Sequence, residues 1–317
     1  MLILLGTEAA MRGAVGIARS LDMSPLVIGV LIIAPAASAP DLAISVRAAT
    51  MNFPDIALGG IIGTCMLNLL FILGFGALLR PLASPPKVVF RDGGAMLLGA
   101  GALALYSAGG TISWQEGVLL LAAFLLYLAL LVVTDWRRAP DHSVPQSRAL
   151  YYSEGASAGP VGGSFLLLLG IVLIILGAHF LVGGSEVLAR QFHWERSFVG
   201  LTLVGFAMSF PKLIATVAAA ARGQASIAVG QLIGANVFAL LGVLGITALV
   251  KPLAVPNALA SVDVLVLAIA TAAVLPVLAM RWRLSRPRGL LLMIAYGGYF
   301  AYVLWRQGLM PALPYLG

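Results

Sequence analysis

The stretch GGIIGTCMLNLLFILG (Gly59–Gly74) recurs later in the chain as GQLIGANVFALLGVLG (Gly230–Gly245). The two copies are 171 residues apart, since 230 − 59 = 171, and the same offset holds on both sides of them. Without a gap, residues Gly6–Leu82 align with Gly177–Leu253, and 25 of the 77 aligned positions are identical. The chain therefore contains one unit twice, which predicts an architecture of two related halves.

The composition places this duplicated chain in a membrane. Of its 317 residues, 61% are hydrophobic and only 10% are charged, so the apolar surface exceeds what a soluble core can bury. Apolar runs of about 20 residues recur, the length that spans roughly 30 Å of hydrocarbon. The single cysteine, Cys65, excludes an internal disulfide. The net charge of +7 lies mostly in short loops and indicates membrane topology rather than nucleic-acid binding.

Ten hydrophobic segments can be drawn, five in each half. They cover residues 1–20, 25–50, 55–79, 92–108, 115–134, 164–190, 196–222, 225–250, 261–281 and 288–306. Pro, Gly, Ser and charged residues concentrate between Thr134 and Ser164, which is typical of a polar linker. An odd number of spans per half means that the second half enters from the opposite face. We therefore predict an all-α membrane protein with ten transmembrane helices arranged as two inverted five-helix repeats. Residues 1–134 form the first repeat, 135–163 a cytoplasmic linker and 164–317 the second repeat.

The basic residues orient this arrangement. With the N-terminus outside, the inner loops hold twelve arginines and lysines and the outer loops hold five. This bias predicts that both termini lie outside and the linker lies in the cytoplasm, in the inner (plasma) membrane of a prokaryote. Five residues precede Gly6 but thirteen apolar or small residues precede Gly177, so the first helix is about two turns shorter than its mate. Either this helix is tilted and partly buried or the true start lies upstream; we favour the second explanation.

Proline stands at the centre of the second segment of each half. The first copy reads IIAPAASAPDLAIS (Ile32–Ser45) and the second reads LVGFAMSFPKLIAT (Leu203–Thr216). Pro40 and Pro211 each remove a backbone hydrogen bond and free a carbonyl one turn earlier. Freed carbonyls at membrane depth are tolerated only where protein or a polar cavity satisfies them. Both segments are therefore candidates for lining a site.

A serine and a charge accompany each proline: Ser38 and Asp41 in the first half, Ser209 and Lys212 in the second. For the serines and prolines alone, a kinked helix whose serine bonds its own backbone is an equally good interpretation. Asp41 and Lys212 favour a site, because ionisable groups at mid-membrane are costly and usually functional. Since equivalent positions of inverted repeats meet near the pseudo-twofold axis, we expect the two charges to approach one another.

The third segments contribute further polar groups. Thr64, Asn68 and Asn236 can face the crossing segments, beside glycine pairs that allow close helix contact. Asn68 is a candidate ligand, whereas interhelical hydrogen bonding is the preferred interpretation of Asn236. The predicted ion-binding or gating residues are Ser38, Asp41, Thr64, Asn68, Ser209 and Lys212, with Asn236 as an additional candidate. Interface or mouth positions are expected for Glu8, His179 and Glu186.

These motifs resemble those of the calcium/cation antiporter superfamily, of the sodium/calcium exchanger type, over nearly the whole chain. That family carries G-T-S-x-P-E in the second helix of each half and G-S-N-x-x-(N/D) in the third. The second helices here read A-A-S-A-P-D (Ala36–Asp41) and A-M-S-F-P-K (Ala207–Lys212). The third helices read G-T-C-M-L-N (Gly63–Asn68) and G-A-N-V-F-A (Gly234–Ala239). The resemblance implies the inverted-repeat fold and cation antiport across a lipid bilayer.

The resemblance also shows where this chain departs from the family. The family's two calcium-binding glutamates fall at Asp41 and Lys212, so one carboxylate is shortened and the other is inverted in sign. Calcium takes six to eight oxygen ligands and needs carboxylates to offset its charge. At 4 Å and an effective dielectric near 20, an ammonium repels a cation by about 4 kcal/mol per unit charge. We therefore expect no standard calcium site. Further family oxygens are absent at Ala37, Met208, Ala235 and Ala239.

Three functional alternatives follow. The first is a secondary-active antiporter with an altered ion site that exchanges a monovalent cation or protons by alternating access. The second is a conventional sodium/calcium or proton/calcium exchanger with displaced ligands. The third is a non-transporting structural or regulatory relative in which an Asp41–Lys212 salt bridge locks the halves. No nucleotide-binding loop or metal-cluster spacing indicates an enzyme, and the expected partners are lipid and small inorganic cations, with no cofactor beyond transported sodium, protons or calcium.

Overall fold

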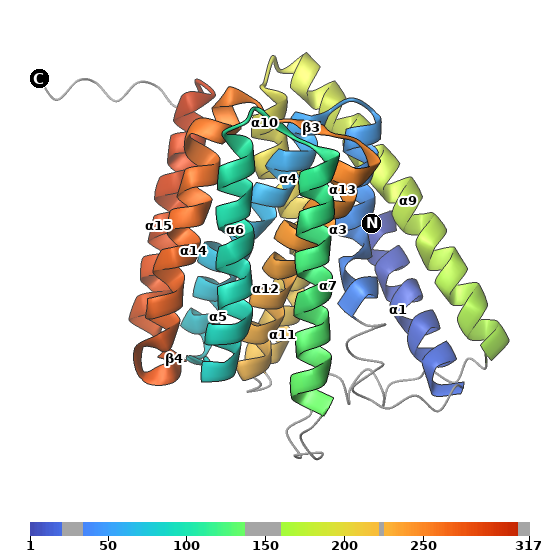
Figure 1. The fold of residues 1–317 in the computed structure, drawn as a ribbon, viewed down its shortest axis with the longest axis vertical. Coiled ribbons are helices and arrows are strands. Elements are labelled where there is room, and N and C mark those ends of the chain that lie inside the picture. Colours follow the sequence, from blue (N-terminus) through green and yellow to red (C-terminus); the bar gives the residue numbers. More distant parts are fainter. Residues whose placement is uncertain (21–33, 137–159, 222–224, 310–317) are drawn as a thin grey trace, which may run out of the picture.

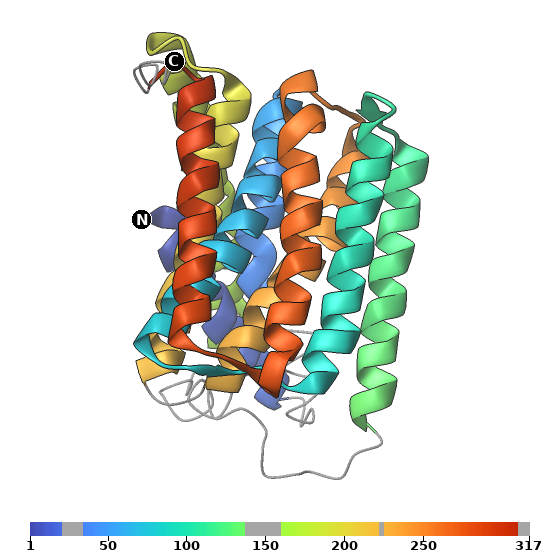
Figure 2. The same ribbon diagram turned by 90° about the vertical axis from the view of Figure 1, so that its left-hand side faces the viewer.

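The chain folds into a bundle of long helices (Figures 1 and 2). The computed structural model describes residues 1–20, 34–136, 160–221 and 225–309. Within these residues, eight helices are long and apolar enough to cross a membrane. They are Pro54–Leu79, Val88–Ser107, Trp114–Thr134, Val161–Gln191, Arg196–Ala220, Ala228–Val250, Leu259–Trp282 and Arg286–Arg306. The expected segments 1–20 and 25–50 correspond to α1 (Leu2–Ser20) and α3 (Ala34–Thr50). Residues 25–33 of the second expected segment lie outside the described part of the chain.

The first half contains ten described elements. They are α1 (Leu2–Ser20), α3 (Ala34–Thr50), α4 (Pro54–Met66), η2 (Leu67–Ile72), α5 (Leu73–Leu79), β1 (Leu82–Ala83), η3 (Val88–Asp92), α6 (Gly93–Ser107), β2 (Thr111–Ile112) and α7 (Trp114–Trp136). Helices α4, η2 and α5 form one continuous span, as do η3 and α6.

The second half repeats this order. Its elements are α9 (Pro160–Gln191), α10 (Arg196–Val199), η4 (Gly200–Val204), α11 (Gly205–Ala221), α12 (Ala225–Val237), η5 (Phe238–Val243), α13 (Leu244–Val250), β3 (Leu253–Ala254), η6 (Leu259–Asp263), α14 (Val264–Ala279), η7 (Met280–Trp282), β4 (Arg283–Leu284) and α15 (Arg286–Arg306). Helix α9 begins at Pro160, four residues before the expected start of the second repeat at Ser164. Most of the expected linker, residues 137–159, lies outside the described part of the chain.

Irregular helix occurs at equivalent positions of the two halves. The π-helical segments η2 and η5 begin at Leu67 and Phe238, and η3 and η6 begin at Val88 and Leu259. Both pairs keep the 171-residue offset. A π-helical turn inserts an extra residue into a helix and is frequent at functional sites. Segment η2 carries Asn68, so this distortion falls on a candidate site residue.

Two short antiparallel ribbons join the halves. Strand β1 pairs with β4, with Leu82 opposite Leu284 and Ala83 opposite Arg283. Strand β2 pairs with β3, with Thr111 opposite Ala254 and Ile112 opposite Leu253. The two ribbons lie at opposite ends of the bundle, with β3 at the top and β4 at the bottom of Figure 1. Each ribbon takes one strand from each half, so the halves are tied together at both ends.

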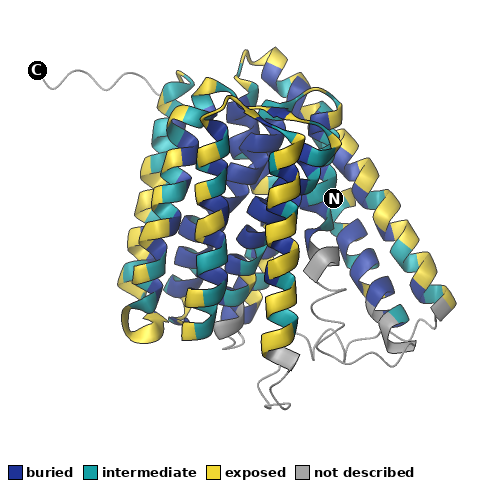
Figure 3. Cartoon of the chain, viewed as in Figure 1, coloured by how far each residue is buried: buried dark blue, intermediate teal, exposed yellow. Residues whose placement is uncertain are grey.

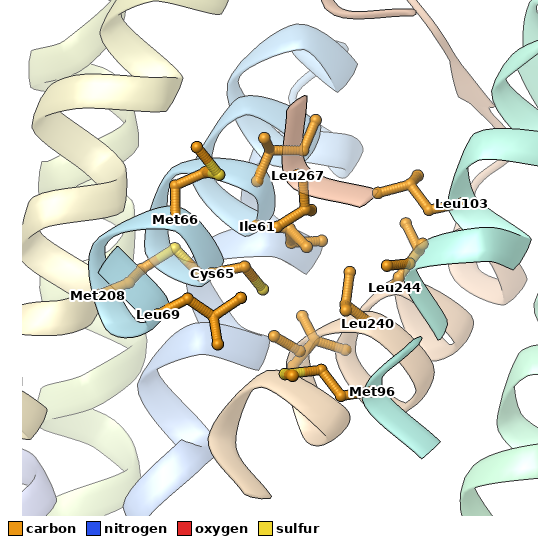
Figure 4. Packing of buried hydrophobic residues seen from close by; sticks show 14 of the residues in the cluster. Ile61, Cys65, Met66, Leu69, Met96, Leu103, Met208, Leu240, Leu244 and Leu267 are labelled. Atoms are coloured by element: carbon orange, nitrogen blue, oxygen red, sulfur yellow. The ribbon is translucent and has the colours of Figure 1, made fainter. Parts of the chain in front are cut away.

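The span Pro54–Leu79 forms the centre of the bundle. Of its most apolar 18-residue window, 94% is buried, against 17% for Trp114–Thr134 and for Arg286–Arg306. Figure 3 shows the same contrast, with buried residues inside and exposed residues along the outer helices. The core joins both halves, because Cys65 and Leu69 from the central span pack in one cluster with Leu240 (Figure 4). The exposed faces of the outer helices are apolar, as a lipid-facing surface requires.

Among the glycines of the central span, Gly63 approaches the second half most closely. A Cβ atom at this position would lie 2.1 Å from the carbonyl oxygen of Leu201, far inside van der Waals contact. Its repeat mate, Gly234, has no atom within 4 Å of the same point. The glycine is therefore required for close helix contact in the first half but not in the second.

We predict that Gly63→Ala destabilises the protein by at least the 1–3 kcal/mol of a typical overpacked core. Gly234→Ala is the matched control and should be neutral or stabilising, because alanine favours a helix interior by roughly 0.5–1 kcal/mol over glycine. Thermal unfolding in detergent measures both, with the buried Cys65 as reporter through a thiol-reactive dye. Equal unfolding temperatures for the two variants would contradict the predicted contact.

Candidate functional site

The candidate site is centred on a buried ion pair between α3 and α11. Lys212 Nζ donates to Asp41 Oδ2 at 2.6 Å and to the backbone carbonyl of Met208 at 2.8 Å. Asp41 is only 2% exposed and Lys212 only 7% exposed. The two residues are repeat mates, and each follows a proline inside its helix, Pro40 in α3 and Pro211 in α11. The structure therefore brings together the two charges that the duplicated sequence places at equivalent positions.

The electrostatics of this pair are set by burial. A charge removed from water at this depth costs several kcal/mol unless it is paired and hydrogen-bonded. The ammonium of Lys212 has two acceptors, one of them the opposite charge, so it is well satisfied. The pair has no net charge when the lysine is protonated, and the site then offers little attraction to a further cation.

Hydroxyl groups form a second contact beside the ion pair. The hydroxyl oxygens of Thr64 and Ser209 share a hydrogen bond of 2.6 Å, which joins α4 to α11. Ser209 also donates to the Thr64 carbonyl at 3.4 Å. Ser38 is buried on α3, three residues before Asp41. Two of the three predicted hydroxyl residues thus contact each other, and the third shares the helix of the carboxylate.

Two asparagines form a third contact. Asn68 Nδ2 donates to Asn236 Oδ1 at 2.8 Å, and Asn236 Nδ2 donates to the Cys65 carbonyl at 3.2 Å. Asn236 and Cys65 are repeat mates, so the amide crosses between the third segments of the two halves. This is the interhelical bonding preferred for Asn236. Asn68 Oδ1 is buried without a hydrogen-bond partner, so it is an oxygen able to bind a cation.

Two hydroxyls that the sequence analysis did not single out also lie next to the site. Ser45 and Thr216 are fully buried and lack a hydrogen-bond partner. They are repeat mates, one helical turn beyond Asp41 and Lys212. In the sequence, the stretches Ile32–Ser45 and Leu203–Thr216 both end in a hydroxyl residue. Serine and threonine are common in membrane helices, however, so only their burial in the structure distinguishes these two.

The remaining ionisable residues considered from the sequence lie away from this centre. Glu186 accepts from Arg196 at 2.6 and 2.8 Å and from Arg190 at 2.5 Å. Arg190 and Arg196 line a hollow of about 680 Å³. Glu8 pairs with Arg12, and His179 accepts a hydrogen bond from Arg47. Among the described residues, no group of three or more His, Cys, Asp and Glu side chains could hold a metal ion.

Comparison with known proteins identifies the family. Residues 1–133 and 163–305 match the family described as sodium/calcium exchanger protein. The chain belongs to the sodium/calcium exchanger family. This exchanger-family chain is 31% identical over 304 residues to the proposed antiporter CaxA of Alkalimonas amylolytica, covering 94% of both chains. It is 26% identical over 331 residues to the sodium/calcium exchanger MaX1 of Methanosarcina acetivorans, covering 95% of both.

The structure of the exchanger-family chain agrees with this assignment. It is similar to the sodium-calcium exchanger NCX_Mj soaked with 2.5 mM Na⁺ and 1 mM Sr²⁺, with a TM-score of 0.64 and 27% sequence identity. The match covers 95% of this chain and 94% of that one. The resemblance inferred from the motifs is confirmed, and the chain is an integral membrane transporter of this family rather than an enzyme.

We predict that Lys212→Met destabilises the exchanger-family chain by about 3–5 kcal/mol, because it leaves Asp41 as an uncompensated buried charge. Adding Asp41→Asn should recover most of the loss, since the pair is then neutral. Arg12→Met is the control, because the Glu8–Arg12 pair is exposed (Arg12 side chain 61%) and such pairs contribute little. Unfolding measured through Cys65 labelling checks the series. A double variant no more stable than Lys212→Met would contradict the pairing.

Proposed function

We propose that this chain is a secondary-active antiporter that exchanges a monovalent cation or protons, with Lys212 acting as a built-in cation opposite Asp41. The observation that carries this proposal is the 2.6 Å contact between Lys212 Nζ and Asp41 Oδ2 inside a buried site. The ammonium occupies the place beside the carboxylate that a transported cation would otherwise take.

We also propose the full architecture of ten transmembrane helices in two inverted five-helix repeats. Residues 1–134 and 164–317 form the repeats, and 135–163 form a cytoplasmic linker, with both termini outside. Three observations support this: the 171-residue sequence repeat, the equivalent π-helical segments and the reciprocal ribbons β1·β4 and β2·β3 at opposite ends of the bundle. The bias of arginine and lysine toward one set of loops supports the orientation.

The exchange follows from the protonation of Lys212. While it is protonated, Lys212 neutralises Asp41 and no further cation is needed. When it loses its proton, Asp41 carries an uncompensated charge and one monovalent cation can replace the ammonium. The proposed ligands are the Asp41 carboxylate, the Ser38 hydroxyl and the free Asn68 Oδ1. Thr64 and Ser209 would gate the crossing of α4 and α11. One cation exchanged for one proton makes the cycle electroneutral.

Calcium is disfavoured by the same geometry. A divalent ion about 4 Å from the Lys212 ammonium would meet roughly 8 kcal/mol of repulsion at an effective dielectric near 20. It would also find one carboxylate where calcium sites normally supply several. The conventional exchanger remains the second candidate, because MaX1 is named a sodium/calcium exchanger and matches this chain over nearly its full length.

Ion flux in proteoliposomes tests the proposal directly. Sodium, potassium, calcium and protons are screened in turn, with Asp41→Asn as the inactive control. Sodium- or potassium-coupled proton movement that is lost in Asp41→Asn supports the proposed antiporter. Calcium flux points to the conventional exchanger, and the absence of any flux points to a non-transporting relative.

We predict that Lys212→Glu creates or strengthens divalent binding, because the site charge changes from about 0 to −2. Calcium affinity by calorimetry should rise at least about tenfold, equivalent to 1.4 kcal/mol. It should stay weaker than in a complete calcium site, because Ala235 and Ala239 supply no side-chain oxygen. Lys251→Glu is the matched control for a charge reversal away from the site. Strong calcium binding by the wild type, unchanged in Lys212→Glu, would show that Lys212 lies outside the ion site.

A further inference from the structure

The turn that leads into β4 has an unusual backbone. Arg281 has φ 60° and ψ 15°, and Trp282 has φ 51°. Residues with a Cβ atom rarely adopt this left-handed conformation, and two in succession are costly. Glycine adopts it without that cost. The turn therefore carries two large side chains at positions where the backbone conformation favours glycine.

The other half provides an internal comparison. The turn that leads into β2 has Gly109 and Gly110 at the equivalent positions, and Gly110 has φ 73°. Both turns make the same contact across their ribbons: Ser84 N–H donates to the Trp282 carbonyl, and Val255 N–H donates to the Gly110 carbonyl. In the first half only Gly110 is left-handed, whereas in the second half both Arg281 and Trp282 are. Strain of this kind persists where the side chains have a use.

The side chains around the strained turn combine exposed aromatic rings with unpaired cations. Trp282 is 38% exposed and lies edge-on against Phe90, which is 70% exposed, with 5.6 Å between ring centroids. Exposed arginines lie in or next to β1 and β4 along the chain; Arg286 donates to the Leu78 carbonyl, and none of them forms an ion pair with any described carboxylate. They are Arg80, Arg281, Arg283 and Arg286. Arg288 donates to the carbonyls of Met280 and Arg283 and so braces the turn.

The location of this cluster is the edge of the membrane. Four spans have an end here, at Leu79, Val88, Trp282 and Arg286. Aromatic rings are enriched at this depth, and arginine guanidinium groups bind phosphate through paired N–H donors. Anionic lipids also give a leaflet surface a negative potential that attracts clustered basic residues.

The ribbon β2·β3, at the opposite end of the bundle, lacks a comparable cluster of arginines. The ribbon registers place Arg283, opposite Ala83, at the position of Thr111, opposite Ala254, so the offset here is 172 residues rather than 171. At this offset Arg281 and Arg286 correspond to Gly109 and Trp114, and only Arg80, at the 171-residue offset, has a basic mate, Lys251. Lys251 donates to Asn52 and so already has a partner. The mate of Arg288 is an acid, Glu116. The cationic cluster is therefore a feature of one face of the bundle and not a by-product of the duplicated fold.

We propose that the β1·β4 ribbon, with Phe90 and the Arg281–Trp282 turn, binds the phosphate headgroup of an anionic phospholipid. Trp282 and Phe90 would seat at the headgroup boundary, and the arginines would contact the phosphate. This site does not depend on which cation the transporter carries.

The test compares lipids added to the purified protein in neutral detergent. Short-chain phosphatidylglycerol should raise the unfolding temperature, and native mass spectrometry should detect it bound. Short-chain phosphatidylcholine and inorganic phosphate at the same concentration should do neither. The double variant Arg281→Gly with Trp282→Gly copies the turn of the other half. Without lipid it should be as stable as the wild type or more stable, and it should bind phosphatidylglycerol about tenfold more weakly through loss of a charge-assisted contact.

Arg283→Gln keeps the turn intact and provides a second, independent variant with the same expected loss of binding. Lys251→Gln, which alters the mate of Arg80 on the opposite ribbon, should bind phosphatidylglycerol like the wild type. Equal stabilisation by phosphatidylcholine, equal protection by inorganic phosphate, or unchanged phosphatidylglycerol binding in both variants would each overturn the proposal.

Discussion

The central constraint on this molecule is that a charge cannot be left alone in the middle of a membrane protein. Asp41 and Lys212 meet this constraint together, because each supplies the other's counter-charge. Their contact joins α3 to α11, and α11 continues from η4, which packs closely against the central span at Gly63. The charge pair and this close helix contact therefore both lie at the interface of the two repeats.

The duplication explains how such a pair can arise. In a symmetric ancestor the same side chain would face its own copy across the axis, and two like charges would repel unless a bound cation lay between them. When one of them is replaced by lysine, the side-chain ammonium takes the place of that bound cation. Other positions have diverged in the same way: the Asn236 amide bonds the backbone of its mate Cys65, and Thr64 bonds Ser209, the mate of Ser38. The site has kept the symmetric backbone while its two sides have taken different roles.

Much of this arrangement was predictable from the residues, since composition and repeat offset led to a membrane transporter with related halves. The family resemblance rested on local motifs such as A-A-S-A-P-D, and the family match confirmed it. The expected meeting of Asp41 and Lys212 needed only the repeat. By contrast, the unpartnered hydroxyls of Ser45 and Thr216 are recognised only by burial, which depends on the neighbouring helices. The left-handed backbone at Arg281 and Trp282 was hidden because the repeat alignment ends at Leu82 and Leu253. The identity of the transported ion and the roles of the site residues stay predictions, because side-chain contacts do not define selectivity.

The two ribbons have a consequence for the biosynthesis of the protein. Their pairing is nested: β2 pairs with β3, and β1 pairs with β4, which enclose the inner pair in the chain order. As the chain leaves the ribosome, both strands of the first half emerge before either partner exists, so they must wait with open edges until the second half is made. The inner ribbon can form as soon as β3 appears, and the outer ribbon only after β4 has been synthesised. The first half is thus an incomplete folding unit, and the outer ribbon is completed by a strand located shortly before α15, the last helix of the described part of the chain.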